Sequence, residues 1–223
     1  FMDYRPAKGF FGSDWVGLKH FIKFFNDTYF LRVIRNTILI SVYSIVFSMP
    51  AAIIFALLIN EIRNIKFKKV VQTVSYLPHF VSLVVICGML RDFLGSDGIV
   101  TSIVSFFGVE RKNLLMVPEY YKAIHVASGI WQTVGWNTII YLSAMSSIDQ
   151  EQYEAADLDG AGRFAKMRYI TLPCILPTIT IMFIMKLGQV MSVGYEKILL
   201  LSNTANREAA QVISSYVYDL SLG

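Results

Sequence analysis

Charged residues are scarce in this sequence. Asp, Glu, Lys and Arg together make up 16% of its 223 residues, whereas a soluble globular domain carries about 25%. The scarcity is concentrated in four charge-free stretches, and a bilayer core about 30 Å thick needs about 20 helical residues to cross it. We therefore predict an all-α fold, a polytopic transmembrane helical bundle, with spans at about 36–60, 70–90, 123–148 and 169–195, the last interrupted by Lys186.

Signals of other protein classes are missing as well. The only two cysteines, Cys87 and Cys174, fall in separate spans, so neither a disulfide framework nor a metal cluster is indicated. No basic run predicts nucleic-acid binding, and no leader pattern predicts a signal peptide. The sequence also has no G-x-x-x-x-G-K-[S/T] loop to hold phosphates. If ATP drives this protein, we expect ATP and Mg²⁺ to be bound by a separate ATPase, with no cofactor in this chain.

The four charge-free stretches contain no aspartate or glutamate. A proton- or ion-coupled secondary transporter needs such a carboxylate in the membrane, so that class is the less favoured alternative. An intramembrane enzyme is disfavoured because His79, His125 and the two cysteines are too scattered to indicate a nucleophile or a metal site. A structural membrane scaffold is the remaining alternative.

Basic residues indicate which loops face the cytoplasm. Loops 61–69 and 149–168 carry seven Lys or Arg in 29 residues, whereas 1–35, 91–122 and 196–223 carry twelve in 95. Because Lys and Arg accumulate in cytoplasmic loops, we predict that the first two loops are cytoplasmic. The segment 1–35, with an interfacial helix, and the segment 196–223 are then external.

The spans differ from plain membrane anchors. Pro50 and Pro78 are expected to kink the first two spans, because each removes a backbone hydrogen bond. Polar and aromatic side chains in the later spans either hold helices together or line a translocation path. The candidate path residues are Trp131, Gln132, Asn137, Tyr141, Lys186 and Gln189.

Lys186 has two alternative placements. Its long side chain either reaches the outer membrane surface or projects into a cavity together with Gln189, which lies three residues on and on the same helix face. A lysine in the cavity would favour an anionic sugar as the substrate.

The segment EQYEAADLDGAGRFAKMRYITLPCILPTI, residues 151–179, is unusually polar for this chain. Ser147 with Gln150 fits a capping box, and Asp149 is an alternative N-cap. Either cap predicts a short helix that runs through about Asp159. Negative side chains early in that helix suit its dipole.

The same segment is expected to turn sharply before the next span. Gly160 and Gly162 weaken or end the first short helix, and residues 161–168 form a second one. Pro173 then lies in the first turn of the fourth span. On the pattern alone, the segment is either a surface that another backbone approaches closely or a solvated interfacial loop.

The spacing Glu154-Ala155-Ala156, Gly160, Ile170, Leu172-Pro173 resembles the loop signature of membrane subunits of binding-protein-dependent ABC importers. Asp159-Gly160-Ala161 is similar to the frequent "DGA" variant. Asn36-Thr37 and WVGLKHFIKFF resemble the carbohydrate-importing, maltose-permease-like branch, and GYEKILLLSN resembles polysaccharide- and lipoprotein-type oligosaccharide permeases. Leu201-Ser202-Asn203-Thr204 replaces the "LT.GGP" of the maltose and glycerol-phosphate subgroups.

The resemblance implies a non-enzymatic permease subunit in a prokaryotic cytoplasmic (inner) membrane. Such a subunit moves an oligosaccharide or sugar derivative by alternating access. The implied partners are a second, homologous and non-identical permease subunit, two ATP-binding subunits and an extracytoplasmic solute-binding protein. Members of this family have six or more spans, so the resemblance also implies one span before Phe1 and one after Gly223.

The resemblance further implies that the loop at 154–160 is a coupling helix seated in a groove of the ATPase. The residues that would make this contact are Glu154, Ala155, Ala156, Asp159 and Gly160.

Overall fold

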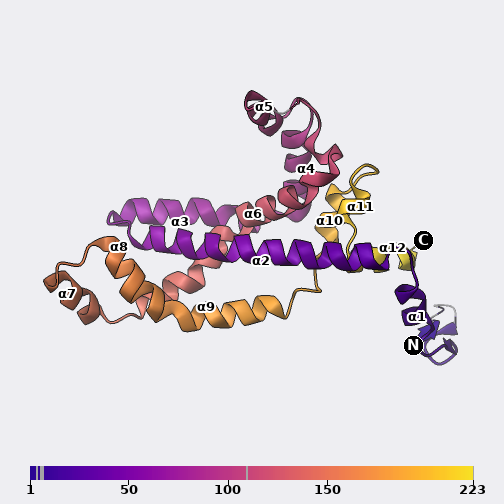
Figure 1. Ribbon diagram of the computed structural model, residues 1–223, viewed down its shortest axis with the longest axis horizontal. Coiled ribbons are helices and arrows are strands. Elements are labelled where there is room, and N and C mark those ends of the chain that lie inside the picture. The colour runs from indigo at the N-terminus through magenta and orange to yellow at the C-terminus, as the bar shows by residue number, and fades with distance from the viewer. Residues whose placement is uncertain (4, 6–7, 109, 223) are drawn as a thin grey trace.

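The structure is a computed structural model that describes residues 1–3, 5, 8–108 and 110–222, and helices dominate it (Figure 1). This confirms the predicted all-α class. At the start of the chain, strands β1 (Met2–Asp3) and β2 (Asp14–Trp15) form a small antiparallel pair. Helix α1 (Lys19–Phe25) follows, where the sequence predicts an interfacial helix.

The remaining elements follow in chain order. They are α2 (Phe30–Asn60), α3 (Ile65–Phe80), α4 (Leu83–Leu94), α5 (Ile99–Phe106), a 3₁₀ turn (Leu114–Met116), α6 (Pro118–Ser146), α7 (Gln150–Leu158), α8 (Arg163–Lys166), a π-helical turn (Met167–Thr171), α9 (Leu172–Leu187), α10 (Tyr195–Leu201), α11 (Arg207–Ala210) and α12 (Ile213–Leu222).

Helix α2 runs along the long axis of the molecule, with α3, α6 and α9 beside it (Figure 1). The connection from α2 to α3 lies at one end, together with α7 and α8. The other end holds α12 and both termini, with α10 and α11 close by, whereas α4 and α5 project to one side from nearer the middle of the long axis. The two loops that the basic residues mark as cytoplasmic, 61–69 and 149–168, therefore lie at the same end of the molecule.

Among the described residues, two helical stretches are by themselves long and apolar enough to cross a membrane, namely α2 and the continuous helix Arg163–Gly188. The expected second span is divided, because α3 and α4 form a pair bent by 99°. Pro78 was expected to kink this span, and the helix ends two residues later at Phe80. By contrast, α2 remains one helix through Pro50. Helix α6, the expected third span, has 29 residues but is less apolar.

The fourth expected span begins and ends earlier than predicted. The predicted second short helix is continuous with the span, because α8, the π-helical turn and α9 follow without a break. Pro173 therefore lies within a longer helix. The π-helical turn lies just before Pro173. Because a proline has no N–H, Pro173 cannot donate the hydrogen bond that would continue the regular α-helical pattern through this turn. Helix α9 then ends at Leu187, and residues 188–194, which include two glycines, form turns instead of continuing to 195.

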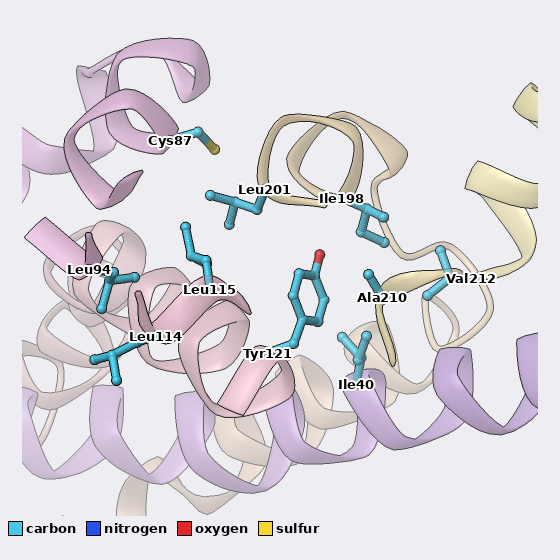
Figure 2. Close-up of a cluster of buried hydrophobic side chains, with 10 residues drawn as sticks. All are labelled: Ile40, Cys87, Leu94, Leu114, Leu115, Tyr121, Ile198, Leu201, Ala210 and Val212. Carbon is cyan, nitrogen blue, oxygen red and sulfur yellow. The ribbon is translucent and has the colours of Figure 1, made fainter. Parts of the chain in front are cut away.

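Two apolar clusters hold the helices together. One lies toward the end of the molecule that holds the termini and joins α2, α4, α6 and α10–α12 (Figure 2). Its members are Ile40, Cys87, Leu94, Leu114, Leu115, Tyr121, Ile198, Leu201, Ala210 and Val212. The second cluster joins α2, α6 and α9 nearer the opposite end, and its members are Ala52, Ala56, Tyr141, Met145 and Ile175.

Polar side chains fix the α10–α12 region to the long helices. Asn36 of α2 donates to the carbonyl groups of Glu208 and Gln211, at 2.8 and 3.1 Å. The Thr37 hydroxyl accepts from the Ile213 N–H at 3.0 Å. The Asn36-Thr37 pair therefore joins α2 to the α11–α12 segment, because it supplies hydrogen-bond partners to backbone groups of that segment.

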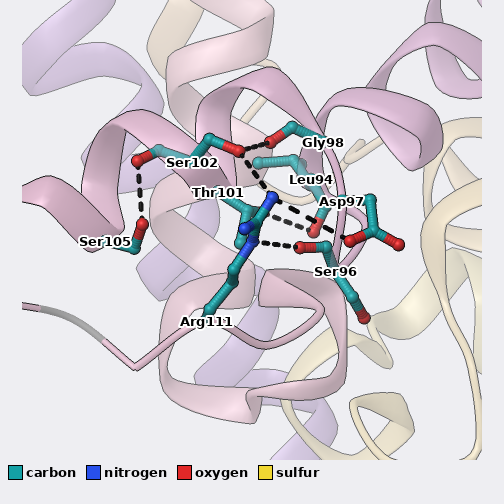
Figure 3. Close-up of polar contacts among 8 residues, drawn as sticks. All are labelled: Leu94, Ser96, Asp97, Gly98, Thr101, Ser102, Ser105 and Arg111. Atoms are coloured by element: carbon teal, nitrogen blue, oxygen red, sulfur yellow. Dashed lines mark hydrogen bonds and ion pairs between the residues drawn. The ribbon is translucent and has the colours of Figure 1, made fainter.

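Arg111 holds the turn between α4 and α5 (Figure 3). Its Nε donates to the Ser96 carbonyl at 3.3 Å, and its Nη2 donates to the Ser102 hydroxyl at 3.2 Å. Asp97 lies 3.9 Å from the same guanidinium. These contacts keep the α4–α5 connection compact on the far side of the molecule from α7.

Candidate coupling helix and transport pocket

Helix α7 begins and ends with regular capping structures. The Asp149 carboxylate accepts from the Glu151 N–H at 3.0 Å, so Asp149 is the N-cap. Ser147, the alternative cap, instead ends α6, where its hydroxyl donates to the Ala144 carbonyl. The Asp149 carboxylate thus accepts a hydrogen bond from a free N–H of the first turn and places a negative charge at the positive end of the helix dipole.

The C-terminus of α7 is a Schellman motif. The Gly160 N–H donates to the Asp157 carbonyl at 3.1 Å, and the Ala161 N–H donates to the Ala156 carbonyl at 2.9 Å. Gly160 has a φ of +74°, a left-handed conformation that side chains with a Cβ rarely adopt. No atom lies within 4 Å of a Cβ built on Gly160. Backbone conformation, and not crowding within this chain, is therefore the reason for glycine at this position.

The outer surface of α7 is largely exposed. Glu154, Ala155, Asp159 and Gly160 are exposed, and Ala156 is half-buried. Leu158 is 91% exposed, which is unusual for a leucine beside a helix end. The sequence analysis missed Leu158, although an apolar residue within this polar helix was a visible signal. Together these residues form a surface with a carboxylate, small side chains and one large apolar side chain.

The inner face of α7 is attached to the start of the fourth span. The Tyr153 and Thr171 hydroxyls are 2.9 Å apart, and Thr171 is buried in the π-helical turn. Lys166 Nζ lies 2.6 Å from the Asp157 carboxylate. The sequence analysis did not identify any of these four residues. They join α7 to the start of the membrane helix at two points.

A polar pocket of about 240 Å³ lies between α2, α6 and the end of α9; we call it the serine pocket. Its polar lining side chains are Ser41, Ser44, Ser48, His125, Lys186, Gln189 and Ser192. The three serines of α2 are spaced i, i+3, i+7 and so lie on one face of the helix. That spacing was the signal the sequence analysis overlooked. Counted at 1.5 Å per residue, Ser44 lies about 21 Å from the start of α2 and about 24 Å from its end.

Of the six candidate path residues, the structure brings only Lys186 and Gln189 together. Both line the serine pocket, which is the second of the two placements considered for Lys186. Tyr141 is 1% exposed inside an apolar cluster, so it lines no cavity within this chain. Trp131 lines a separate, apolar pocket of about 550 Å³ beside α4 and α5.

The remaining polar residues of α6 have local or helix-packing contacts. The Asn137 amide lies 3.4 Å from the Thr133 hydroxyl, one turn earlier in the same helix, and Gln132 is half-buried. The Trp136 ring stacks on His79 of α3, with ring centroids 4.5 Å apart. A Cβ on Gly135 would collide with the backbone of Ser75, so α3 and α6 approach closely at this position.

Within the described residues, no group of three or more His, Cys, Asp or Glu side chains is placed to hold a metal ion. Cys87 is buried and Cys174 is exposed, and both are free thiols. The outer surface of α7 and the serine pocket are two candidate sites that each contain two or more sequence-predicted residues.

The sequence matches a protein family described as the inner membrane component of binding-protein-dependent transport systems, over residues 29–220. The Bacillus subtilis (strain 168) polygalacturonan/rhamnogalacturonan transport system permease protein YteP is 41% identical over 223 residues, which are 100% of this chain and 70% of that protein. Protein LplB of the same strain is 38% identical over the same shares of the two chains.

The fold also resembles a solved transporter. A chain in the crystal structure of a bacterial ABC transporter that imports the acidic polysaccharide alginate superposes with a TM-score of 0.88 and 42% identity. The match covers 93% of this chain and 73% of that one. A second crystal structure of a bacterial alginate ABC transporter includes a periplasmic protein bound to an alginate pentasaccharide, and there the TM-score is 0.87.

Proposed function

The chain belongs to the family of inner membrane components of binding-protein-dependent transport systems, and on this premise we propose that it imports an oligosaccharide as one subunit of an ATP-driven ABC importer. In this proposal a solute-binding protein delivers the oligosaccharide from outside. A second, homologous permease subunit completes the path through the membrane. Two ATP-binding subunits hold ATP and Mg²⁺ at the cytoplasmic face, and this chain binds no cofactor.

The observation that carries the proposal is the outer surface of α7. Its carboxylate Glu154 makes no ion pair among the described residues, so it is available for a charge-assisted contact with a partner. Ala155 and Gly160 leave room for a close backbone approach, and Leu158 is free to fill an apolar pocket. We infer that an ATP-binding subunit covers this surface.

The connections of α7 to the fourth span supply the mechanical link. When the ATP-binding subunits close, α7 moves with them, and the Tyr153–Thr171 and Lys166–Asp157 contacts carry the movement to α9. Helix α9 forms one wall of the serine pocket through Lys186. Its displacement therefore changes the access of the pocket from one side of the membrane to the other.

ATP is needed in this scheme because substrate binding alone shifts a conformational equilibrium only by its differential affinity for the two states. The secondary-transporter alternative is not favoured. A secondary transporter needs an aspartate or glutamate within the membrane, and the four expected spans contain neither. The family is also one of binding-protein-dependent systems.

Co-purification tests the proposal. The full-length chain, expressed with the products of its neighbouring genes, is expected to purify with an ATP-binding subunit whose hydrolysis rises when the loaded solute-binding protein is added. Reconstituted vesicles should then take up oligosaccharide only when ATP is present on the cytoplasmic side. Uptake that proceeds without ATP, or a chain that purifies without an ATP-binding partner, would contradict the proposal.

A further inference from the structure

We propose that the serine pocket binds the carboxylate of a uronic-acid residue during transport, with Lys186 as the counter-ion. This inference rests on the proposed function, because it names the chemical class of the transported oligosaccharide and a site for it. It concerns residues on α2, α6 and α9 that are distant from the coupling surface of α7.

The charge of the pocket is the first argument. Lys186 is half-buried in the lining, and the lining contains neither aspartate nor glutamate. Among the described residues, Lys186 forms no ion pair and no side-chain hydrogen bond. Lys186 lies in the last turn of α9, but the pocket that it lines includes Ser44 near the middle of α2, and a lysine at that membrane depth is costly without a partner. An anionic substrate group is the partner that this arrangement lacks.

His125 is the second argument. It is 9% exposed, it lines the same pocket, and its Nδ1 has no hydrogen-bond partner among the described residues. A buried polar atom without a partner is rare in proteins and calls for an explanation. The Nδ1 atom is covered in this conformation, so a sugar hydroxyl or carboxyl group in the pocket supplies the missing hydrogen bond once the His125 ring turns toward it. Ser44 and Ser48 add two hydroxyls on the opposite wall.

Lys197 increases the positive charge behind the pocket wall. Its Nζ donates to the backbone carbonyl of His125 at 2.9 Å, and the side chain is 9% exposed. Burial lowers the pKa of Lys197 to about 8. The amine therefore remains mainly protonated at pH 7, and its field favours a negative charge in the adjacent cavity.

The size of the pocket limits what it holds. Its volume of about 240 Å³ is below the roughly 300–1,000 Å³ of clefts that enclose drug-sized ligands. We infer that it accommodates one sugar residue of a chain at a time. The described lining has no arginine for two-point binding of a carboxylate or a phosphate, so Lys186 makes a single-point contact with the anion. The hydroxyls of Ser44 and Ser48 favour an anion that is carried on a sugar ring.

A labelling experiment reads occupancy of the pocket independently of ATP. In the assembled importer, Ser48→Cys is introduced with the exposed Cys174 replaced by alanine, and its rate of reaction with a small thiol reagent is measured. Trigalacturonate is expected to protect Ser48→Cys, whereas its uncharged methyl ester and glycerol 3-phosphate are not. Adding Lys186→Gln should abolish the protection, and Lys186→Arg should retain it.

Uptake gives the second readout. Lys186→Gln is expected to lower trigalacturonate uptake about tenfold or more, the loss expected for one charge-assisted contact. Lys122→Gln is the matched control, because it removes a half-buried lysine of α6 outside the pocket. Equal protection with and without Lys186, or protection by the methyl ester, would overturn the inference. If the wild-type importer shows protection but no ATP-dependent uptake, the proposed function fails while the pocket assignment stands.

Discussion

Replacement of Gly160 by alanine separates backbone strain from loss of coupling. The φ of +74° at Gly160 costs a residue with a Cβ about 1–2 kcal/mol. No atom of this chain lies within 4 Å of the added methyl group, so steric overlap adds nothing to the instability of the isolated subunit. At about 2–4 °C per kcal/mol for a chain of this size, we expect the melting temperature to fall by roughly 2–8 °C.

The effect on coupling is expected to be larger. If an ATP-binding subunit packs against this turn, the extra methyl group overpacks the contact by about 1–3 kcal/mol. The contact then weakens by about 5- to 150-fold. The assay is the number of ATP molecules hydrolysed per oligosaccharide moved by the reconstituted importer, which should rise strongly in Gly160→Ala. Gly160→Asp should uncouple further, although aspartate tolerates the left-handed conformation better than alanine.

Gly108 supplies the matched control. It also has a positive φ, +91°, and open space around an added Cβ, but it follows α5, which projects to one side of the molecule away from α7. Gly108→Ala should lower the melting temperature by a similar amount and leave the ratio of ATP to oligosaccharide unchanged. An unchanged ratio in Gly160→Ala, or an equal increase in Gly108→Ala, would refute the reasoning.

Three further predictions concern contacts in the structure. Tyr153→Phe removes the hydroxyl contact with Thr171, so we expect a stability loss of about 0.5–1.5 kcal/mol in a thermal melt and more ATP hydrolysed per oligosaccharide moved. An unchanged ratio of ATP to oligosaccharide would show that this contact does not carry the movement of α7 to α9. Asn206→Ala removes the donor to the Leu201 carbonyl and one of the two donors to the Leu115 carbonyl, so the folded state should lose about 1–3 kcal/mol in a thermal melt, whereas the exposed Asn26→Ala should lose less. The hydrogen bond from Tyr216 lowers the pKa of the Asp27 carboxyl, so this bond stabilises the folded state above the ordinary carboxyl pKa of about 3.8, and the stabilisation is lost as the pH falls below that value. Tyr216→Phe should therefore reduce the fall of the melting temperature at acid pH, and an unchanged fall would contradict the assignment.

The sequence was sufficient to predict the class of fold and the short helix α7. Charge-free stretches predict the long helices of the bundle. Asp149 and Gly160 predict where α7 begins and ends, because both act on backbone groups only a few residues away in the sequence. The size of the bend between α3 and α4 could not be predicted from the sequence. A proline indicates where a helix weakens, but the 99° angle depends on how α4 packs against α10.

The pocket illustrates the same limit. Lys186 and Gln189 were candidates because of their positions in one helix, whereas the α2 serines joined them only through tertiary packing. Tyr141 and Trp131 were grouped with them because polar aromatic residues suit both a sugar path and a helix interface. The direction that each side chain faces on α6 separates these roles, and that direction follows from the partner helices.

A crosslinking measurement at Leu158 tests the central claim most directly. A photo-crosslinking residue placed at position 158, which is 91% exposed on α7, is compared with one at Phe106, which is 88% exposed at the end of α5, away from α7. The account predicts an adduct with the ATP-binding subunit from position 158 and none from position 106. The absence of that adduct from position 158 in an importer that hydrolyses ATP would contradict it.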